Sequence, residues 1–158
     1  MNQALERLAS ELALNDAAHE RLRLEFGYAC ALRVRHLLEE PEVEECLRSL
    51  GAYLAGSADQ EALALTAAKA AQLANHHQGS KSIDGCGHAA VSATYAVAKA
   101  VAGKALEAAS YAAYAAVYAQ GGYAAVAALE SFEPEHAWQV SSLTSLAKPA
   151  AANAGCAG

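Results

Sequence analysis

The sequence has few of three large apolar residues that often fill protein cores: phenylalanine, tryptophan and methionine. Its 158 residues include two Phe, one Trp and one Met. It also lacks any run in which β-branched or aromatic residues alternate with polar ones, which is the pattern of a half-buried strand. These absences argue against a β-sandwich or a β-barrel.

Charged residues are also sparse. They make up 18% of the chain, and acidic residues exceed basic ones to give a net charge of −6. No cluster of Lys and Arg stands out, so we expect no nucleic-acid partner. The low charge content argues equally against a disordered acidic chain.

Alanine takes the place of the missing large residues. It accounts for 43 of the 158 residues, and 26 of these lie between residues 62 and 128. Alanine is the best helix former, and small residues let helices pack closely. We therefore expect an all-α fold, a single-domain antiparallel bundle of about seven or eight alanine-rich helices over residues 1–147. A short stack of helical hairpins is the alternative.

Capping residues, prolines and glycines divide the chain. They predict helices over residues 3–14, 16–40, 41–56, 57–77, 89–102, 104–120, 123–129 and 133–146. Ser57 and Gln60 match a capping box, and Gly27 is expected at a close packing contact within a helix. Residues 78–87 are expected to form a loop, and the Ala/Gly-rich residues 148–158 a flexible tail.

The N-terminal residues mix charged and apolar types and do not resemble a secretory signal. The four cysteines show no C-x-x-C spacing, so we expect reduced thiols in a cytoplasmic protein. Residues 105–129 carry a single formal charge, but alanine is barely hydrophobic and Gln120 interrupts the segment. We therefore expect a buried helix there and no membrane span.

Four potential metal ligands lie within thirteen residues around the predicted loop: His76, His77, Cys86 and His88. Zn²⁺ binds side chains of these types. However, adjacent histidines on a helix point about 100° apart, and Cys-x-His is not a recurrent zinc spacing. We expect no metal and no other cofactor, and keep metal binding as an alternative function.

No set of residues combines a nucleophile, a base and an oxyanion donor, so we expect a protein that is not an enzyme. The paired carboxylates, including Glu133 and Glu135, lie at predicted helix ends, where they complement the helix dipole.

Three tyrosines follow the spacing i, i+3, i+7: Tyr111, Tyr114 and Tyr118. This spacing favours a stripe at the edge of the core, and the alternative is an aromatic patch for a protein partner. In a second alternative function, a structural homo-oligomer, the Ala/Tyr helices pack between subunits.

Three blocks of sequence resemble a known family. They are residues 28–39 (YACALRVRHLLE), residues 85–90 (GCGHAA), and Glu135-His136-Ala137-Trp138-Gln139 followed by Leu143. Together they are similar to the immunity-five-like, all-helical domain of bacterial immunity proteins from polymorphic-toxin systems, over about residues 25–146. The resemblance implies a cytoplasmic protein that binds and neutralises a cognate toxin.

The third block supplies the remaining candidate partner-binding residues, which join the three tyrosines: Glu135, Trp138 and Gln139. From its helical position, Trp138 is expected to fill the end of the bundle. Gln139 is expected to cap a neighbouring helix.

Overall fold

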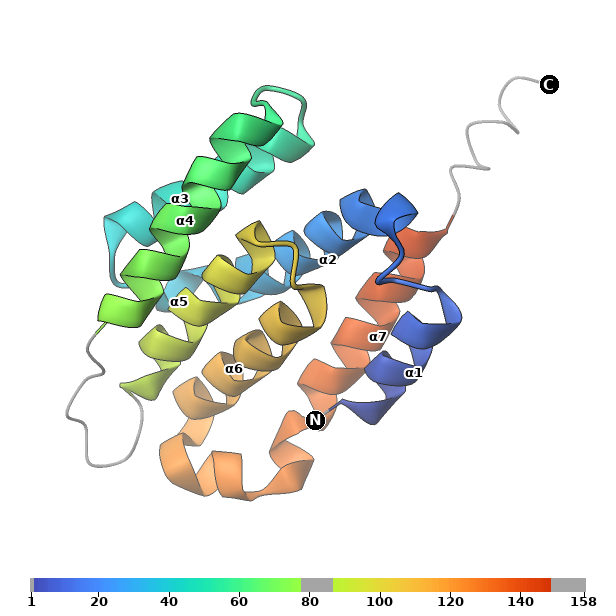
Figure 1. Ribbon diagram of the computed structural model, residues 1–158. Coiled ribbons are helices and arrows are strands. Elements are labelled where there is room, and N and C mark those ends of the chain that lie inside the picture. Colours follow the sequence, from blue (N-terminus) through green and yellow to red (C-terminus); the bar gives the residue numbers. More distant parts are fainter. Residues whose placement is uncertain (1, 78–86, 149–158) are drawn as a thin grey trace.

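Most of the helices begin and end close to where the sequence predicts, and the second predicted helix is the exception. The computed structural model describes residues 2–77 and 87–148, and within them it has seven α-helices and no strand. The helices, shown in Figure 1, are α1 (Gln3–Glu11), α2 (Glu20–Arg33), α3 (Pro41–Leu54), α4 (Gln60–His76), α5 (His88–Val101), α6 (Ala105–Ala127) and α7 (Glu133–Ala147). The predicted all-α fold is confirmed. Most of the predicted loop and tail lies outside the described residues.

The predicted helix over residues 16–40 is too long at both ends. Asp16 caps a short 3₁₀ turn, η1 (Ala17–His19), by accepting a hydrogen bond from the Ala18 N–H, and α2 begins after it. At the other end, α2 stops at Arg33 and is followed by η2 (Arg35–Leu37). Pro41 drives the residue before it into extended backbone, so the helix cannot continue to Glu40, whose φ and ψ are −99° and 121°.

The predicted capping box at Ser57 is wrong. Asp59 caps α4, and its carboxylate accepts a hydrogen bond of 2.8 Å from the Ala62 N–H. Ser57 belongs to the end of α3, where its N–H donates to the Ala52 carbonyl and Gly56 has a φ of 83°. This pairing is a Schellman motif, which uses Ser57 for its backbone and leaves its side chain without a capping role.

A break at Gly121 and Gly122 divides α6 into two helical pieces, as the sequence predicts. Gly122 has φ 61° and ψ −143°, a conformation that only glycine adopts readily. The chain turns there and continues through η3 (Leu129–Phe132), the orange segment at the bottom of Figure 1. After the turn, Val126 and Phe132 pack back against Ala113 and Val117 of the first piece.

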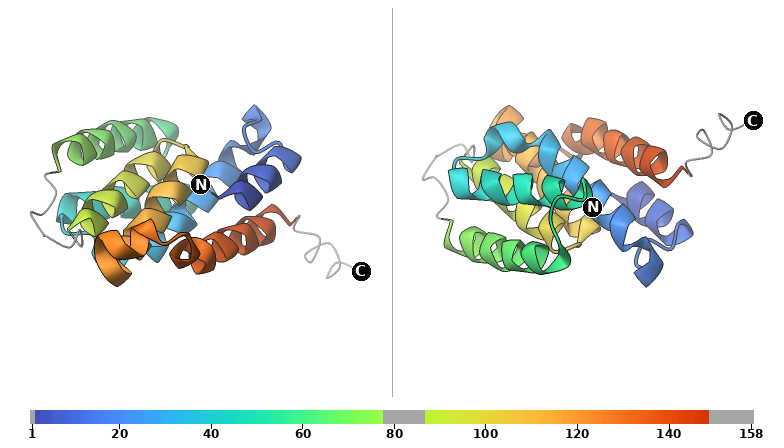
Figure 2. Two further views of the ribbon diagram at one scale, coloured as in Figure 1. Left: turned by 90° about the horizontal axis from the view of Figure 1, so that it is seen from below. Right: turned by 90° about the horizontal axis from the view of Figure 1, so that it is seen from above.

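The helices form a bundle around α5. Helix α5 packs against α2, α3, α4 and α6, and α2 also contacts α6 and α7. In both views of Figure 2, α3 and α4 lie at one end and α1 and α7 at the other. In a solenoid, each repeat contacts only its neighbours. The contacts of α2 with α5, α6 and α7 therefore favour the predicted bundle over the hairpin stack.

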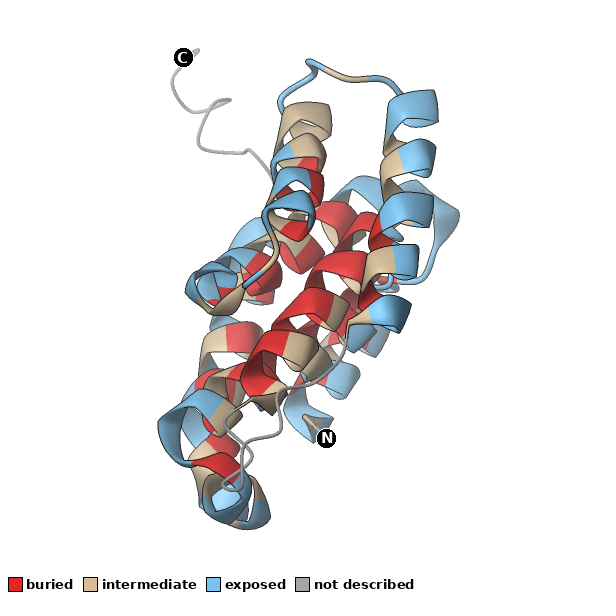
Figure 3. Ribbon diagram, turned by 90° about the vertical axis from the view of Figure 1, so that its left-hand side faces the viewer, coloured by how far each residue is buried: buried red, intermediate tan, exposed pale blue. Residues whose placement is uncertain are grey.

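The close packing predicted at Gly27 is confirmed. A Cβ on Gly27 would lie 3.1 Å from the Ala100 Cα, so α2 and α5 touch through their backbones. Beside this contact, Phe26 and Cys30 are fully buried in one core cluster, and Leu47 and Leu50 are buried in another. Figure 3 shows the buried residues concentrated along the middle of the molecule.

In the part of the chain that the structure describes, no helix is both long enough and apolar enough to cross a membrane. The segment that raised this question in the sequence, residues 105–129, lies within α6, the joint that follows it and the start of η3. Several of its alanines are buried against other helices, including Ala108, Ala109 and Ala115.

Candidate functional site

A cleft with a volume of about 510 Å³ opens between α1, α6 and the segment from η3 into α7. This volume lies in the range of binding pockets, roughly 300–1,000 Å³. We call it the α1–α6–α7 cleft. It exists because the chain returns along α6 after the Gly121–Gly122 break and places η3 opposite the start of α1.

Apolar side chains form most of the wall of the cleft. They are Leu5, Leu106, Ala113, Tyr114, Val126, Leu129 and Phe132. At its rim, Leu129 is 82% exposed and Tyr114 is 40% exposed. The cleft therefore continues onto the surface as an apolar and aromatic patch.

The polar part of the lining is acidic or neutral. It consists of Asn2, Glu6, Glu107, Ser110, His136 and Gln139. Glu107 pairs with Lys99 at 3.2 Å, whereas Glu6 has no ion pair with any described residue. Burial lowers the pKa of His136 from its ordinary value, which favours the neutral imidazole there.

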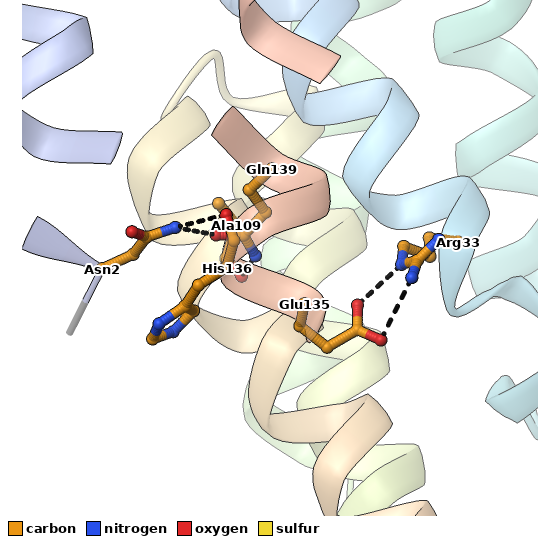
Figure 4. Close-up of polar contacts among 6 residues, drawn as sticks. All are labelled: Asn2, Arg33, Ala109, Glu135, His136 and Gln139. Atoms are coloured by element: carbon orange, nitrogen blue, oxygen red, sulfur yellow. Dashed lines mark hydrogen bonds and ion pairs between the residues drawn. The ribbon is translucent and has the colours of Figure 1, made fainter. Parts of the chain in front are cut away.

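A chain of hydrogen bonds beside the cleft ties three helices together (Figure 4). The Asn2 side chain accepts from the Leu5 N–H at 3.1 Å and so caps α1. Its amide nitrogen donates to the Gln139 side chain at 3.1 Å and to the His136 carbonyl at 3.2 Å. Gln139 in turn donates to the Ala109 carbonyl at 2.8 Å. These hydrogen bonds fix the N-terminus of α1 and the helix α7 against the middle of α6.

The predicted role of Gln139 as a helix cap is therefore wrong. Gln139 is 2% exposed and bonds to Ala109, which lies inside α6 and not at its terminus. The cap of α1 is Asn2, whose shorter side chain reaches the free N–H groups of the first turn. Gln139 orients that cap and lies at the base of the cleft.

Glu135 and Trp138 use a different side of α7. Glu135 accepts two hydrogen bonds from Arg33 of α2, at 2.6 and 3.3 Å, and the Arg33 guanidinium lies 4.5 Å from the centre of the Trp138 ring. Figure 4 shows Glu135 pointing toward α2 and away from Asn2. The carboxylate thus does more than complement the helix dipole. Together with Trp138 it clamps α7 onto α2.

The three predicted tyrosines separate into two groups. Tyr111 stacks on Tyr95, with ring centres 5.1 Å apart. The other two belong to a continuous series of aromatic side chains, in which each ring contacts the next. We call this series the aromatic row: Tyr123, His88, Tyr118, Tyr114, Phe132 and His136. The row runs from the start of α5 along α6 into the cleft.

The candidate metal ligands that the structure describes each contact a different residue. His76 Nδ1 lies 2.7 Å from the Gln72 carbonyl, and His88 Nε2 lies 2.8 Å from the Tyr123 hydroxyl. His77 Nε2 lies 3.6 Å from a Glu40 carboxylate oxygen. Among residues 2–77 and 87–148, no three His, Cys, Asp or Glu side chains are grouped so that they could hold a metal ion. Cys86 lies outside the described residues.

The two described cysteines are buried and unbonded to each other. Burial raises the pKa of the Cys30 thiol strongly and also raises that of Cys46. Both thiols are therefore protonated at neutral pH, a state in which a cysteine is a poor nucleophile. They serve the packing of the two core clusters.

The structure thus brings two of the six predicted partner-binding residues, Tyr114 and Gln139, into one cleft. Tyr118 joins them through the aromatic row, and Glu135, Trp138 and Tyr111 lie elsewhere. The sequence reasoning missed Asn2, Leu129 and Arg33. Arg33 gave a usable signal, because it follows Leu22, Phe26 and Cys30 at helical spacing, and a charged residue on such an apolar face requires a partner.

No protein-family model matches the chain, and no curated protein or solved structure matches it either. The resemblance to the immunity-five-like domain accordingly stays a prediction from the sequence.

Proposed function

We propose that the protein is a non-catalytic immunity protein that binds a cognate bacterial toxin in the cytoplasm and neutralises it by covering its active surface. The proposal starts from the three sequence blocks that resemble the immunity-five-like domain. One structural observation supports a protein-binding role: an aromatic row that is exposed at Tyr114 and Tyr123 leads into a cleft whose charged lining residues are glutamates.

The composition of this surface is typical of protein interfaces. Tyrosine and phenylalanine are enriched there, and apolar side chains that fill pockets provide much of the binding energy. Single exposed apolar residues are common on any protein. Here, however, Leu129 is 82% exposed and Tyr123 is 50% exposed, and both adjoin aromatic or apolar neighbours on the same surface.

The charge of the surface favours a basic partner. Residues 105–147, which include α6, η3 and α7, contain four glutamates and neither lysine nor arginine. Glu107 pairs with Lys99 and Glu135 with Arg33, whereas Glu130 and Glu133 are exposed and form no ion pair with a described residue. A surface of one sign attracts a partner of the opposite sign and orients it during the encounter. A basic toxin domain would meet such a field, and an acidic protein would be repelled by it.

Co-expression with the product of a neighbouring toxin-like gene tests the function. The protein should relieve growth inhibition and co-elute with the toxin on size exclusion. Leu129→Glu should weaken both effects, because it places a charge at the apolar rim. Leu65→Glu is the matched control, since Leu65 is 68% exposed but lies on α4.

Unrelieved toxicity with no complex would contradict the proposed function. Loss of protection through Leu65→Glu and not through Leu129→Glu would place the binding surface on α4. Light scattering at several concentrations separates the homo-oligomeric alternative. A stable oligomer that is disrupted by Leu129→Glu would assign the rim of the cleft to contacts between copies of the chain.

A further inference from the structure

We infer that the α1–α6–α7 cleft receives a basic segment of the partner protein, with one apolar anchor side chain inside the cleft and lysine or arginine beside it. This inference rests on the proposed function and specifies the chemistry of the partner. It follows from three features of the cleft: its space, its charge and its fixed walls.

The space suits an apolar anchor. Leu106, Tyr114 and Phe132 line the cleft together with two small residues, Ser110 and Ala113. No larger side chain of the described chain fills the space next to the small ones, which leaves a cleft of about 510 Å³. An aliphatic or aromatic side chain of a partner would bury apolar area on most sides, which is the usual setting of an interface hot spot.

The negative charge at the cleft favours a basic residue of the partner next to the anchor side chain. Among the described residues that line the cleft, only Glu6 and Glu107 carry a formal charge, and Glu107 is already paired with Lys99. Glu130 and Glu133 are exposed in the adjoining segment of η3 and α7, and neither forms an ion pair with a described residue. A lysine or arginine beside the anchor would meet uncompensated carboxylates, whereas an aspartate or glutamate would be repelled.

The walls are held in place before a partner arrives. The hydrogen bonds of Asn2, Gln139 and Ala109 fix α1 and α7 against α6, and the pair of Arg33 with Glu135 fixes α7 against α2. A pre-organised cleft loses less conformational entropy on binding. A short segment with a single anchor can therefore bind measurably by itself.

Fluorescence anisotropy with short labelled peptides tests this chemistry without the toxin. The probes are an amphipathic Leu/Lys peptide, the same peptide with Ser in place of Leu, and the same peptide with Glu in place of Lys. We expect the Leu/Lys peptide to bind and both altered peptides to bind at least about tenfold more weakly, because each lacks one of the two contacts.

Two pairs of variants locate the binding. Ser110→Trp fills the cleft and should weaken the Leu/Lys peptide about tenfold or more, whereas Ala64→Trp on exposed α4 should not. Glu6→Lys should weaken it up to about fivefold, and Glu11→Lys makes the same charge change on α1 outside the cleft and should have little effect. Circular dichroism checks that each variant is folded.

The outcomes are distinct. Equal binding of the Ser/Lys peptide, or equal weakening by Glu6→Lys and Glu11→Lys, would overturn the inference, since binding would then depend on overall charge alone. Neutralisation of the toxin by the Ser110→Trp variant would also overturn it while leaving the proposed function intact. Peptide binding that Ser110→Trp abolishes, without any neutralisation, would support the cleft and contradict the proposed function.

Discussion

The alanine-rich centre of the molecule packs tightly against a neighbouring helix on one side and borders an open cleft on the other. Between α2 and α5, Gly27 meets Ala100 so closely that a Cβ on the glycine would lie 3.2 Å from the Ala100 Cβ. Between α6, α1 and η3, the small residues Ser110 and Ala113 face a cleft of about 510 Å³. The same kind of residue thus produces both results.

The difference lies in the partner that each helix meets. Two helix backbones approach closely when both helices have small side chains at the contact, as at Gly27 and Ala100. On the open side, the opposing wall carries Leu5 and Phe132, which hold the segments apart while the small residues of α6 leave space between them. A high density of alanine therefore indicates close helix packing only where the neighbouring helix also has small side chains at the contact.

The largest expected effect tests the closed side. Phe26 is fully buried in the core beside α2 and α5, so Phe26→Ala should lower the free energy of unfolding by about 3–5 kcal/mol. Leu129→Ala, on the open side, should change it by less than about 0.5 kcal/mol. Urea unfolding followed by circular dichroism measures both. Equal losses would contradict the contrast between the two sides.

A smaller effect is expected where the chain turns to form the cleft. Gly122→Ala forces a side chain into φ 61° and ψ −143° and should cost about 1–3 kcal/mol. Gly121→Ala is the matched control, because the φ of Gly121, −164°, is open to any residue. Its new Cβ has only the Ala125 methyl to displace. Thermal melts should place Gly122→Ala clearly below Gly121→Ala, and the reverse order would contradict this account of the turn.

The clamp that holds α7 on α2 should contribute somewhat less. Glu135→Ala removes both hydrogen bonds to Arg33, with an expected loss of about 1.5 kcal/mol, at the low end for charged hydrogen bonds because the Arg33 side chain is 35% exposed. Glu133→Ala, two residues earlier and exposed, should change stability by less than about 0.5 kcal/mol. Similar losses for the two variants in urea would show that the clamp contributes nothing.

The smallest effect concerns pH. Because burial lowers the pKa of His136, the folded state binds fewer protons than the unfolded state near the ordinary value of 6.5. Stability should therefore rise with pH through this range and be lost as the pH falls below 6.5. His136→Asn should flatten the slope between pH 7.5 and 5.5 in urea titrations. An unchanged slope would mean that the imidazole titrates alike in both states.

The sequence predicted the helices well where local signals decide them. Pro41 and the Gly121–Gly122 pair mark real boundaries, and Gly27 marks a real close contact. The errors arose where two local signals overlapped. Ser57 has the residue type of an N-cap, but Gly56 takes it into the end of the preceding helix through backbone hydrogen bonds.

The candidate site was less accessible from the sequence because it depends on distant contacts. Asn2 and Gln139 are separated by most of the chain, and no periodicity links them. Glu135 at a helix start has a sufficient local explanation in the helix dipole, so its pairing with Arg33 could not be inferred from Glu135 itself. The tyrosine spacing located α6 correctly and could not show which rings face the cleft.

The measurement that tests the central claim most directly is hydrogen–deuterium exchange of the protein with and without its toxin. The account predicts slower exchange on binding in residues 2–11 and 123–139, which form α1 with its cap and the segment from the second piece of α6 through η3 into α7. Slower exchange confined to α3 and α4, with residues 123–139 unchanged, would contradict the claim that the acidic cleft and its aromatic row bind the partner.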